Sequence, residues 1–273
     1  MKIINIDNYI LYLLILSAII WQSPTIFFQF AFIAFVILLI LIIKSIKIAI
    51  SGKLFFTAGS FDLPILLVSI SYILSTIFST PSKMDAVISP GTTTIILLGA
   101  IIYFLVNQIS LSEKRSLTSF MIAGLTIHST LILLSIAKII PWMLPEGAYF
   151  ASVLFIIPLL PITVNVIFKQ KDFAYKLLAV ISLFITIFAL SILIYKIIFN
   201  KNYSPKYPSF KISANIALQT LKKNPILGIG SGNYLESFNK YRSFDYNKTN
   251  IWAAKFNQGS SFLITNLTEI GIL

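Results

Sequence analysis

The sequence predicts an all-α fold, a polytopic bundle of transmembrane helices with one large extracytoplasmic loop that contains a short amphipathic helix. Of the 273 residues, 57% are hydrophobic and only 11% are charged, which leaves too little polar surface to cover a soluble globule of this size. Long apolar runs such as residues 26–43 do not alternate apolar with polar side chains, so membrane-crossing helices are favoured over a β-barrel.

Apolar runs mark the expected spans in order along the chain. A helix of roughly 20 apolar residues crosses a hydrocarbon core about 30 Å thick. The first run is short for a crossing, and we expect it to be an uncleaved span because no small-residue cleavage site follows it. The expected spans are 9–21, 25–43, 63–79, 93–110, 118–140, 147–168 and 174–199, and an eighth begins near residue 261.

Positive charge alternates between the connections of these spans. Lysine and arginine residues precede the first span and follow spans 2, 4 and 6, whereas the other short connections hold almost none. The positive-inside rule then places the N-terminus in the cytoplasm and, after seven crossings, the next connection outside the cytoplasmic membrane. The expected division is a transmembrane bundle over residues 1–199, a large extracytoplasmic loop over 200–260 and the start of a further, truncated transmembrane helix over 261–273.

The outer loop is strongly basic. It carries nine lysine and arginine residues against only Glu236 and Asp245, in a chain of net charge +12. This charge suits a solvated surface or a site for a phosphate or diphosphate. Nucleic acid is not an expected partner, because the loop is extracytoplasmic and has no recognised binding motif. With no cysteine and one histidine in the chain, we expect no disulfide, no metal and no cofactor.

The first part of the loop predicts a short helix. Residues 211–223 form a broad apolar face, as in an amphipathic helix that lies on the membrane or on the bundle. The residues of this face are Ile212, Ala214, Ile216, Ala217, Leu218 and Leu221. Lysines at its C-terminal end and the Asn-Pro pair that follows are typical of a helix end.

A glycine-rich segment, NPILGIGSGNY, follows this helix. Gly228, Gly230 and Gly232 alternate in it, and glycine permits positive φ angles and the close approach of another chain or a ligand. The segment suits a structural turn, and it also suits a nest of backbone amides that binds an anion. It is not a nucleotide motif, because it lacks the GxGxxG spacing and the Walker lysine.

The segment NPILGIGSGNYLESFNKYR, followed by NKTNIW at 247–252 and LTEIGIL at 267–273, resembles the O-antigen ligase and O-antigen polymerase family over roughly residues 211–273. The resemblance implies a many-helix membrane fold with one large extracytoplasmic loop late in the chain. It also implies a glycosyltransferase that moves a glycan from a polyprenyl (undecaprenyl) diphosphate carrier to an acceptor lipid, protein or growing glycan at the outer face of the cytoplasmic membrane.

The resemblance assigns roles to residues of the loop. Family loops hold the diphosphate with arginines, and Arg242 is the only arginine of this loop. Lys211 stands where an arginine commonly opens the loop helix, and it keeps the charge without the bidentate fork. The acidic position of the family is Glu269. A His-Asn pair of the family falls at Ser260 and Ser261, for which a helix-start role is the alternative.

These assignments give a set of candidate site residues for a metal-independent transfer. The candidates for the general base are Glu269, Glu236 and Asp245. The candidates for substrate binding are Arg242, Lys211, Lys255, Gly228, Gly230, Gly232, Asn233, Tyr241, Trp252, Ser260 and Ser261.

Two other functions stay open at the level of the sequence. A transporter or flippase of lipid-linked glycan would predict an internal repeat and polar residues in the spans, and neither is found. A non-catalytic membrane scaffold predicts that replacement of Arg242 and Lys211 leaves no biochemical trace. His128 lies inside the fifth span, where it is either a neutral side chain bonded to a neighbouring helix or a functional group.

Overall fold

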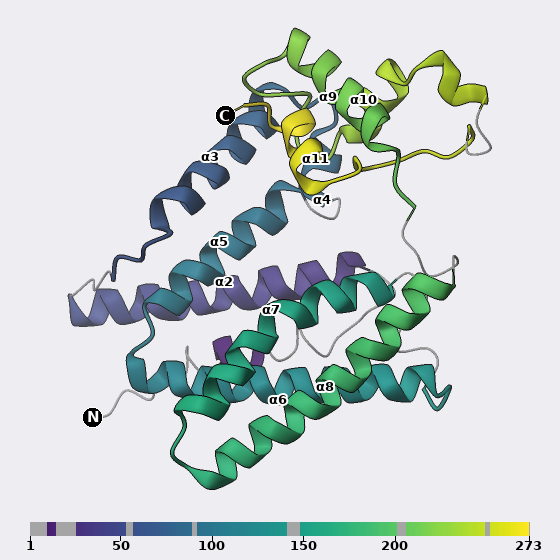
Figure 1. Ribbon diagram of the computed structural model, residues 1–273. Coiled ribbons are helices and arrows are strands. Elements are labelled where there is room, and N and C mark those ends of the chain that lie inside the picture. Colours follow the sequence, from purple (N-terminus) through teal and green to yellow (C-terminus); the bar gives the residue numbers. More distant parts are fainter. Residues whose placement is uncertain are drawn as a thin grey trace. The chain divides into compact units, whose positions relative to one another are not determined.

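The protein is all-helical in the part that the computed structural model describes, which is residues 10–14, 26–52, 57–88, 92–140, 148–200, 206–248 and 252–272 (Figure 1). Five stretches are long and apolar enough to cross a membrane, and the helix Asp62–Phe78 is apolar but shorter. The all-α class predicted from the sequence is confirmed for the described residues, and these stretches suggest a membrane protein. They are Ala31–Ser51, Lys83–Asn107, Lys114–Ile136, Tyr149–Lys169 and Phe173–Phe199.

The expected spans between residues 25 and 199 correspond to helices, with small shifts at their ends. The largest shifts are at the end of α2, which continues to Ser51, and at the start of α6, which begins at Leu111, because both helices extend through polar residues beside the apolar run. Most of the first expected span, residues 15–21, lies outside the described residues. The helices are α2 (Ile26–Ser51), α3 (Asp62–Phe78), α5 (Thr93–Asn107), α6 (Leu111–Ile136), α7 (Ala148–Lys169) and α8 (Phe173–Phe199).

The chain divides into two compact units. Unit 1 comprises Met1–Phe55 and Gln108–Pro205, and unit 2 comprises Phe56–Asn107 and Lys206–Leu273. Unit 2 holds the segment from α3 to α5 together with the late loop because the two are hydrogen-bonded, as described below. The expected division into a transmembrane bundle, an extracytoplasmic loop and a further span stays a prediction.

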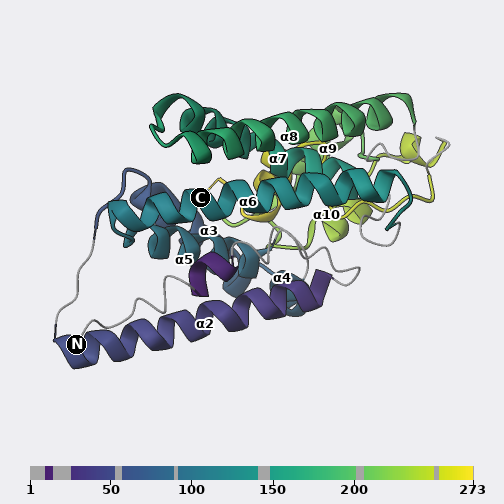
Figure 2. The ribbon, with the colours of Figure 1, turned by 90° about the horizontal axis from the view of Figure 1, so that it is seen from below.

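In unit 1, α6, α7 and α8 pack on one another (Figure 2). Hydroxyl groups join α6 to α8 at three levels, each with an offset of 56 or 57 residues, so the two helices run parallel. Such contacts between small polar side chains stabilise helix packing in lipid. The donor and acceptor pairs are Ser119 and Tyr175 at 2.8 Å, Thr126 and Ser182 at 2.7 Å, and Ser129 and Thr186 at 3.2 Å.

The single histidine is also part of this packing. His128 is buried in α6, and its ring meets the ring of Phe155 in α7 edge to face at 5.2 Å. The histidine thus contacts a neighbouring helix, as one of its two sequence interpretations expects.

Unit 2 joins two apolar helices to the late loop. Besides α3 and α5 it contains α4 (Lys83–Ile88), α9 (Phe210–Lys223), α10 (Tyr234–Tyr241), the 3-10 helix η2 (Phe244–Lys248) and α11 (Phe262–Glu269). The loop helices have an apolar core of their own. It consists of Ile216, Tyr234, Phe238, Tyr246 and Phe256.

Helix α9 covers the stretch for which the sequence predicts an amphipathic helix. Ser209 is the N-cap of the helix, because its hydroxyl accepts a hydrogen bond from the amide of Ile212, and Asn224 is the C-cap. The buried face is narrower and more polar than the apolar pattern indicates, because it includes Ser213 and Thr220. Leu218, in contrast, is 58% exposed.

Helix α11 begins where the eighth span is expected and ends after eight residues. In a continuing helix the amide of Ile272 would donate to Thr268 O. Instead, Ile272 donates to Pro225 O, and Thr268 O accepts from Ile229. Gly271 adopts a φ of 75° at this point. The backbone partners offered by the loop therefore end the helix, whereas the apolar sequence alone predicts its continuation.

Candidate functional site

Two of the three motif segments of the resemblance meet in unit 2. The glycine-rich turn, residues 225–232, lies against the C-terminal end of α11, where the amide of Gly230 donates to Glu269 O at 2.8 Å. Together with the bonds of Ile229 and Ile272, this contact makes a short backbone ladder between segments that are about 40 residues apart in the sequence. The glycine-rich turn and the LTEIG segment are thus one structural feature.

The carboxylate of Glu269 lies inside this feature. Its side chain is only 4% exposed, and it accepts hydrogen bonds from the backbone amides of Gly232 and Tyr234, the latter at 3.3 Å. Burial raises the pKa of the Glu269 carboxyl from 4.5 to about 7, although the two amides favour the ionised form. The Glu269 carboxyl thus occupies the amides of Gly232 and Tyr234, which are no longer open to an anion from outside.

The three glycines of the turn are required by close contacts. A Cβ on Gly228 would lie 2.5 Å from Thr268 O, one on Gly232 would lie 2.8 Å from Asp85 O, and one on Gly230 would overlap Thr80. All three residues have positive φ angles, which other residues rarely adopt. The sequence left a structural turn and an anion nest as alternatives, and these contacts favour the structural turn.

Hydroxyl groups at the end of α3 hold the turn in place. Ser75 Oγ donates to Leu227 O at 2.9 Å and to Glu269 O at 2.8 Å, and Ser79 Oγ donates to Gly228 O. The turn therefore lies at the C-terminal end of an apolar helix. Sequence reasoning missed these serines; their spacing of four residues, one helical turn, places them on one face of α3 but does not identify their partners.

The positive side chains of the candidate site fall into two groups. Arg242 ends α10, its Nη1 donates to Trp252 O at 3.4 Å, and its guanidinium lies 5.7 Å from the ring centre of Tyr246. Tyr246 in turn donates to Ala254 O, so Arg242, Trp252 and the exposed Lys255 belong to one region of the loop. Lys211 is exposed in the first turn of α9.

Ser260 and Ser261 have different environments. Ser261 opens α11, because its Oγ accepts the amide hydrogen of Ile264 at 3.3 Å, and its predicted helix-start role is confirmed. The amide of Ser260 donates to Ser213 Oγ at 3.0 Å, while the buried Ser260 Oγ has no hydrogen-bond partner among the described residues. This contact joins the start of α11 to the first half of α9. Ser213 is two residues from Lys211 in the sequence.

Tyr234 is a buried neighbour that sequence reasoning did not select. Burial raises its pKa, and the hydroxyl of Ser213 partly offsets this shift. Gly259 leaves room for the Tyr234 hydroxyl, which would lie 3.3 Å from a Cβ at that position. Ser213, Tyr234 and Ser260 thus form a small group of hydroxyls beneath the start of α11.

The remaining candidates occupy separate places. Glu236 is exposed in the first turn of α10, and Tyr241 is partly exposed at the end of that helix. Asn233 is buried, and its amide group donates to Ser231 O at 2.8 Å. The side chain of Asp245 lies outside the described residues.

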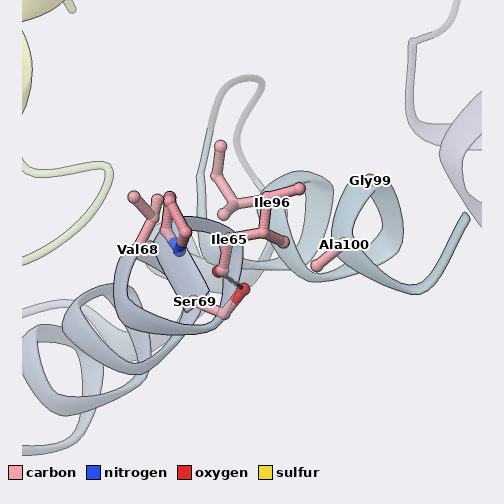
Figure 3. A pocket seen from close by; sticks show the side chains of 7 residues that line it. Ile65, Val68, Ser69, Ile96, Gly99 and Ala100 are labelled. Atoms are coloured by element: carbon pink, nitrogen blue, oxygen red, sulfur yellow. Dashed lines mark hydrogen bonds between the residues drawn. The ribbon is translucent and has the colours of Figure 1, made fainter. Parts of the chain in front are cut away.

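An apolar groove of about 240 Å³ lies between α3 and α5 (Figure 3). Its one polar side chain, Ser69, donates its hydroxyl to Ile65 O at 2.7 Å. The groove has no charged lining and is therefore unsuited to a diphosphate. It is lined by Pro64, Ile65, Val68, Ser69, Ile96, Gly99 and Ala100.

Among the described residues, no group of three or more acidic or histidine side chains is placed to hold a metal ion. A comparison of the chain with protein-family models, with curated proteins and with solved structures finds no match.

Proposed function

We propose that the protein transfers a glycan from a polyprenyl diphosphate carrier to an acceptor at the outer face of the cytoplasmic membrane. The observation that carries this proposal is the joining of the glycine-rich turn to the LTEIG segment at the end of α3. Two of the segments that carry the family resemblance are thus joined by backbone hydrogen bonds, with the basic side chains of the loop outside this feature.

The chemistry requires charge stabilisation more than a nucleophile from the protein. The acceptor hydroxyl attacks the anomeric carbon, the bond from that carbon to the phosphate oxygen breaks, and the polyprenyl diphosphate leaves with the bonding electrons. Arg242 and Lys255 supply positive charge for the leaving diphosphate from one region of the loop, and Lys211 supplies it from α9. Glu236 and Asp245 are the candidates to accept the hydroxyl proton.

Glu269 has a different role in this proposal. Its carboxylate is buried and already accepts hydrogen bonds from two backbone amides of the loop. In this proposal it positions the turn and does not contact the substrate. The apolar groove between α3 and α5 offers a surface to the polyprenyl chain of the donor.

The test is transfer of a labelled glycan from a polyprenyl diphosphate donor by the full-length protein in membranes. We expect Arg242→Ala to lower the rate by about 100-fold or more, because a charge-assisted donor is lost. Arg242→Lys keeps the charge without the fork and should retain part of the activity. Arg115→Ala is the matched control, since Arg115 is the other arginine of the chain and is exposed in unit 1.

If the parent protein is active and Arg242→Ala lowers the rate no more than Arg115→Ala does, Arg242 is not part of the site. If the parent transfers nothing from a panel of donors to a panel of acceptors, the transferase is wrong and the scaffold is the better interpretation.

A further inference from the structure

A second basic feature lies where α9 and α10 end. Lys223 and Lys240 come from different helices, yet both ammonium groups lie over the ring of Tyr241, at 5.5 and 5.7 Å from its centre. Both lysines are exposed, and neither forms an ion pair with a described carboxylate. Like charges that converge in this way favour an anion between or beside them.

An exposed aromatic side chain, that of Trp252, is linked to this pair through Arg242. Arg242 follows Tyr241, and its guanidinium donates to the backbone of Trp252. The side chain of Trp252 is 60% exposed, which is unusual for a large apolar group on an aqueous surface and often marks an interaction site. Lys223, Lys240, Tyr241 and Trp252 together are called the basic aromatic surface.

The position of the basic aromatic surface argues against the bilayer as its partner. In both views of the ribbon, the segment that follows α10 extends away from α3 and α5 within unit 2 (Figures 1 and 2). The candidate membrane span Lys83–Asn107 includes α5, and the segment that contains Trp252 therefore leads away from a helix that suits lipid. A ligand for the basic aromatic surface must offer both negative charge for the lysines and a flat apolar face for the aromatic rings.

We propose that the basic aromatic surface binds an acidic polysaccharide chain, with sugar carboxylates or phosphates paired to Lys223 and Lys240 and sugar rings packed on Trp252. This inference rests on the proposed function, because it names the chemical class of the glycan that is transferred. Binding does not itself require transfer, and the two are measured separately.

The experiment uses the full chain in nanodiscs of zwitterionic lipid, in a Trp21→Phe, Trp142→Phe background that leaves Trp252 as the single tryptophan. Oligogalacturonate is the acidic probe, and a malto-oligosaccharide of the same length is the neutral one. Trp252 fluorescence reports binding. We expect the acidic probe to bind more tightly and its affinity to fall with salt. The double variant Lys223→Gln, Lys240→Gln should bind it about tenfold more weakly.

Lys169→Gln, Lys171→Gln is the matched control, because it removes two lysines from unit 1, and its binding should not change. Equal affinity for the two probes, or an unchanged affinity in the Lys223, Lys240 variant, would overturn the inference. Strong quenching of Trp252 by brominated lipid in the absence of probe would also overturn it and assign the surface to the bilayer. If the parent protein binds the acidic probe but transfers no glycan, the proposed function is rejected and the binding inference stands.

Discussion

Glu269 has a pKa far above the ordinary value of a glutamate. Its carboxyl is buried, the amides of Gly232 and Tyr234 are its hydrogen-bond donors, and its pKa is about 7. The Tyr72 hydroxyl donates to Asn266 Oδ1, in the same helix as Glu269, at 2.8 Å. The charge of Glu269 contributes to the raised pKa of Tyr234, of which burial is the main cause. Two amide donors thus only partly offset the desolvation of the charge.

The first prediction concerns pH and stability. The unfolded chain ionises Glu269 near 4.5, whereas the folded protein does so near 7, so the folded state binds the extra proton between these values. Stability from this group is therefore present below pH 4.5 and is lost as the pH rises to 7, by on the order of 3 kcal/mol. Glu269→Gln removes the titration and should flatten this decline in thermal unfolding at pH 5, 6, 7 and 8.

Glu236→Gln is the control for that series, because Glu236 is an exposed carboxylate on α10. It should leave the pH profile of the parent unchanged. A profile of Glu269→Gln that still follows the parent between pH 5 and 7 would show that another group causes the decline.

Several residue roles could be predicted from the sequence, and others could not. Ser261 was predicted to start a helix, because a serine before an apolar run is a local signal. Ser75 and Ser79 were missed because their partners, Leu227 and Gly228, lie about 150 residues away. A single sequence contains no record of such distant contacts. The burial of Glu269 was missed for the same reason.

At the scale of elements, the glycine-rich turn and α11 determine each other. The turn takes the carbonyls of Thr268 and Glu269, which ends α11, and the glycines allow the backbones to approach. The existence and bounds of α9 followed from its pattern and its Asn-Pro end. Its buried face did not, because Ser213 and Thr220 are buried by hydrogen bonds to Ser260 and Ser237, which hydrophobic periodicity does not detect.

A comparison of Gly228 with Gly52 distinguishes the cost of a steric contact with α11 from the cost of backbone strain. Gly228 and Gly52 have nearly the same φ, 61° and 64°. A Cβ on Gly52 would meet nothing within 4 Å, whereas one on Gly228 would lie 2.5 Å from Thr268 O. Gly52→Ala should therefore cost about 1 kcal/mol from strain alone. Gly228→Ala should cost about 3 kcal/mol or more, since a backbone atom must also move.

Thermal unfolding of the two variants in the same detergent checks this difference. Limited proteolysis adds a local readout, because Gly228→Ala should expose the loop of unit 2 to cleavage. Equal losses of stability in the two variants would mean that the turn does not lie against α11 in the membrane.

At the scale of the whole molecule, the contact between the turn and the end of α3 restricts the topology. Ser79 and Gly228 lie on the same side of the membrane because their groups form a hydrogen bond. The number of crossings between them must then be even, and four candidate spans separate them. This count agrees with the predicted topology and does not depend on the first span. The sequence alone offered only the distribution of lysine and arginine for this purpose.

The last prediction tests sidedness with single cysteines, which the cysteine-free chain permits. Lys83→Cys, at the start of α4, and Lys240→Cys, in α10, should react with a membrane-impermeant maleimide added to intact cells. Lys171→Cys, between α7 and α8, should react only after the membrane is opened, because one crossing separates it from the loop. All three side chains are exposed, so access is decided by the membrane. Labelling of Lys83→Cys and Lys240→Cys from opposite sides would be incompatible with the bond between the turn and α3. Labelling of both only in opened cells would keep that bond and reverse the predicted orientation, which would remove the loop from the face where the proposed transfer takes place.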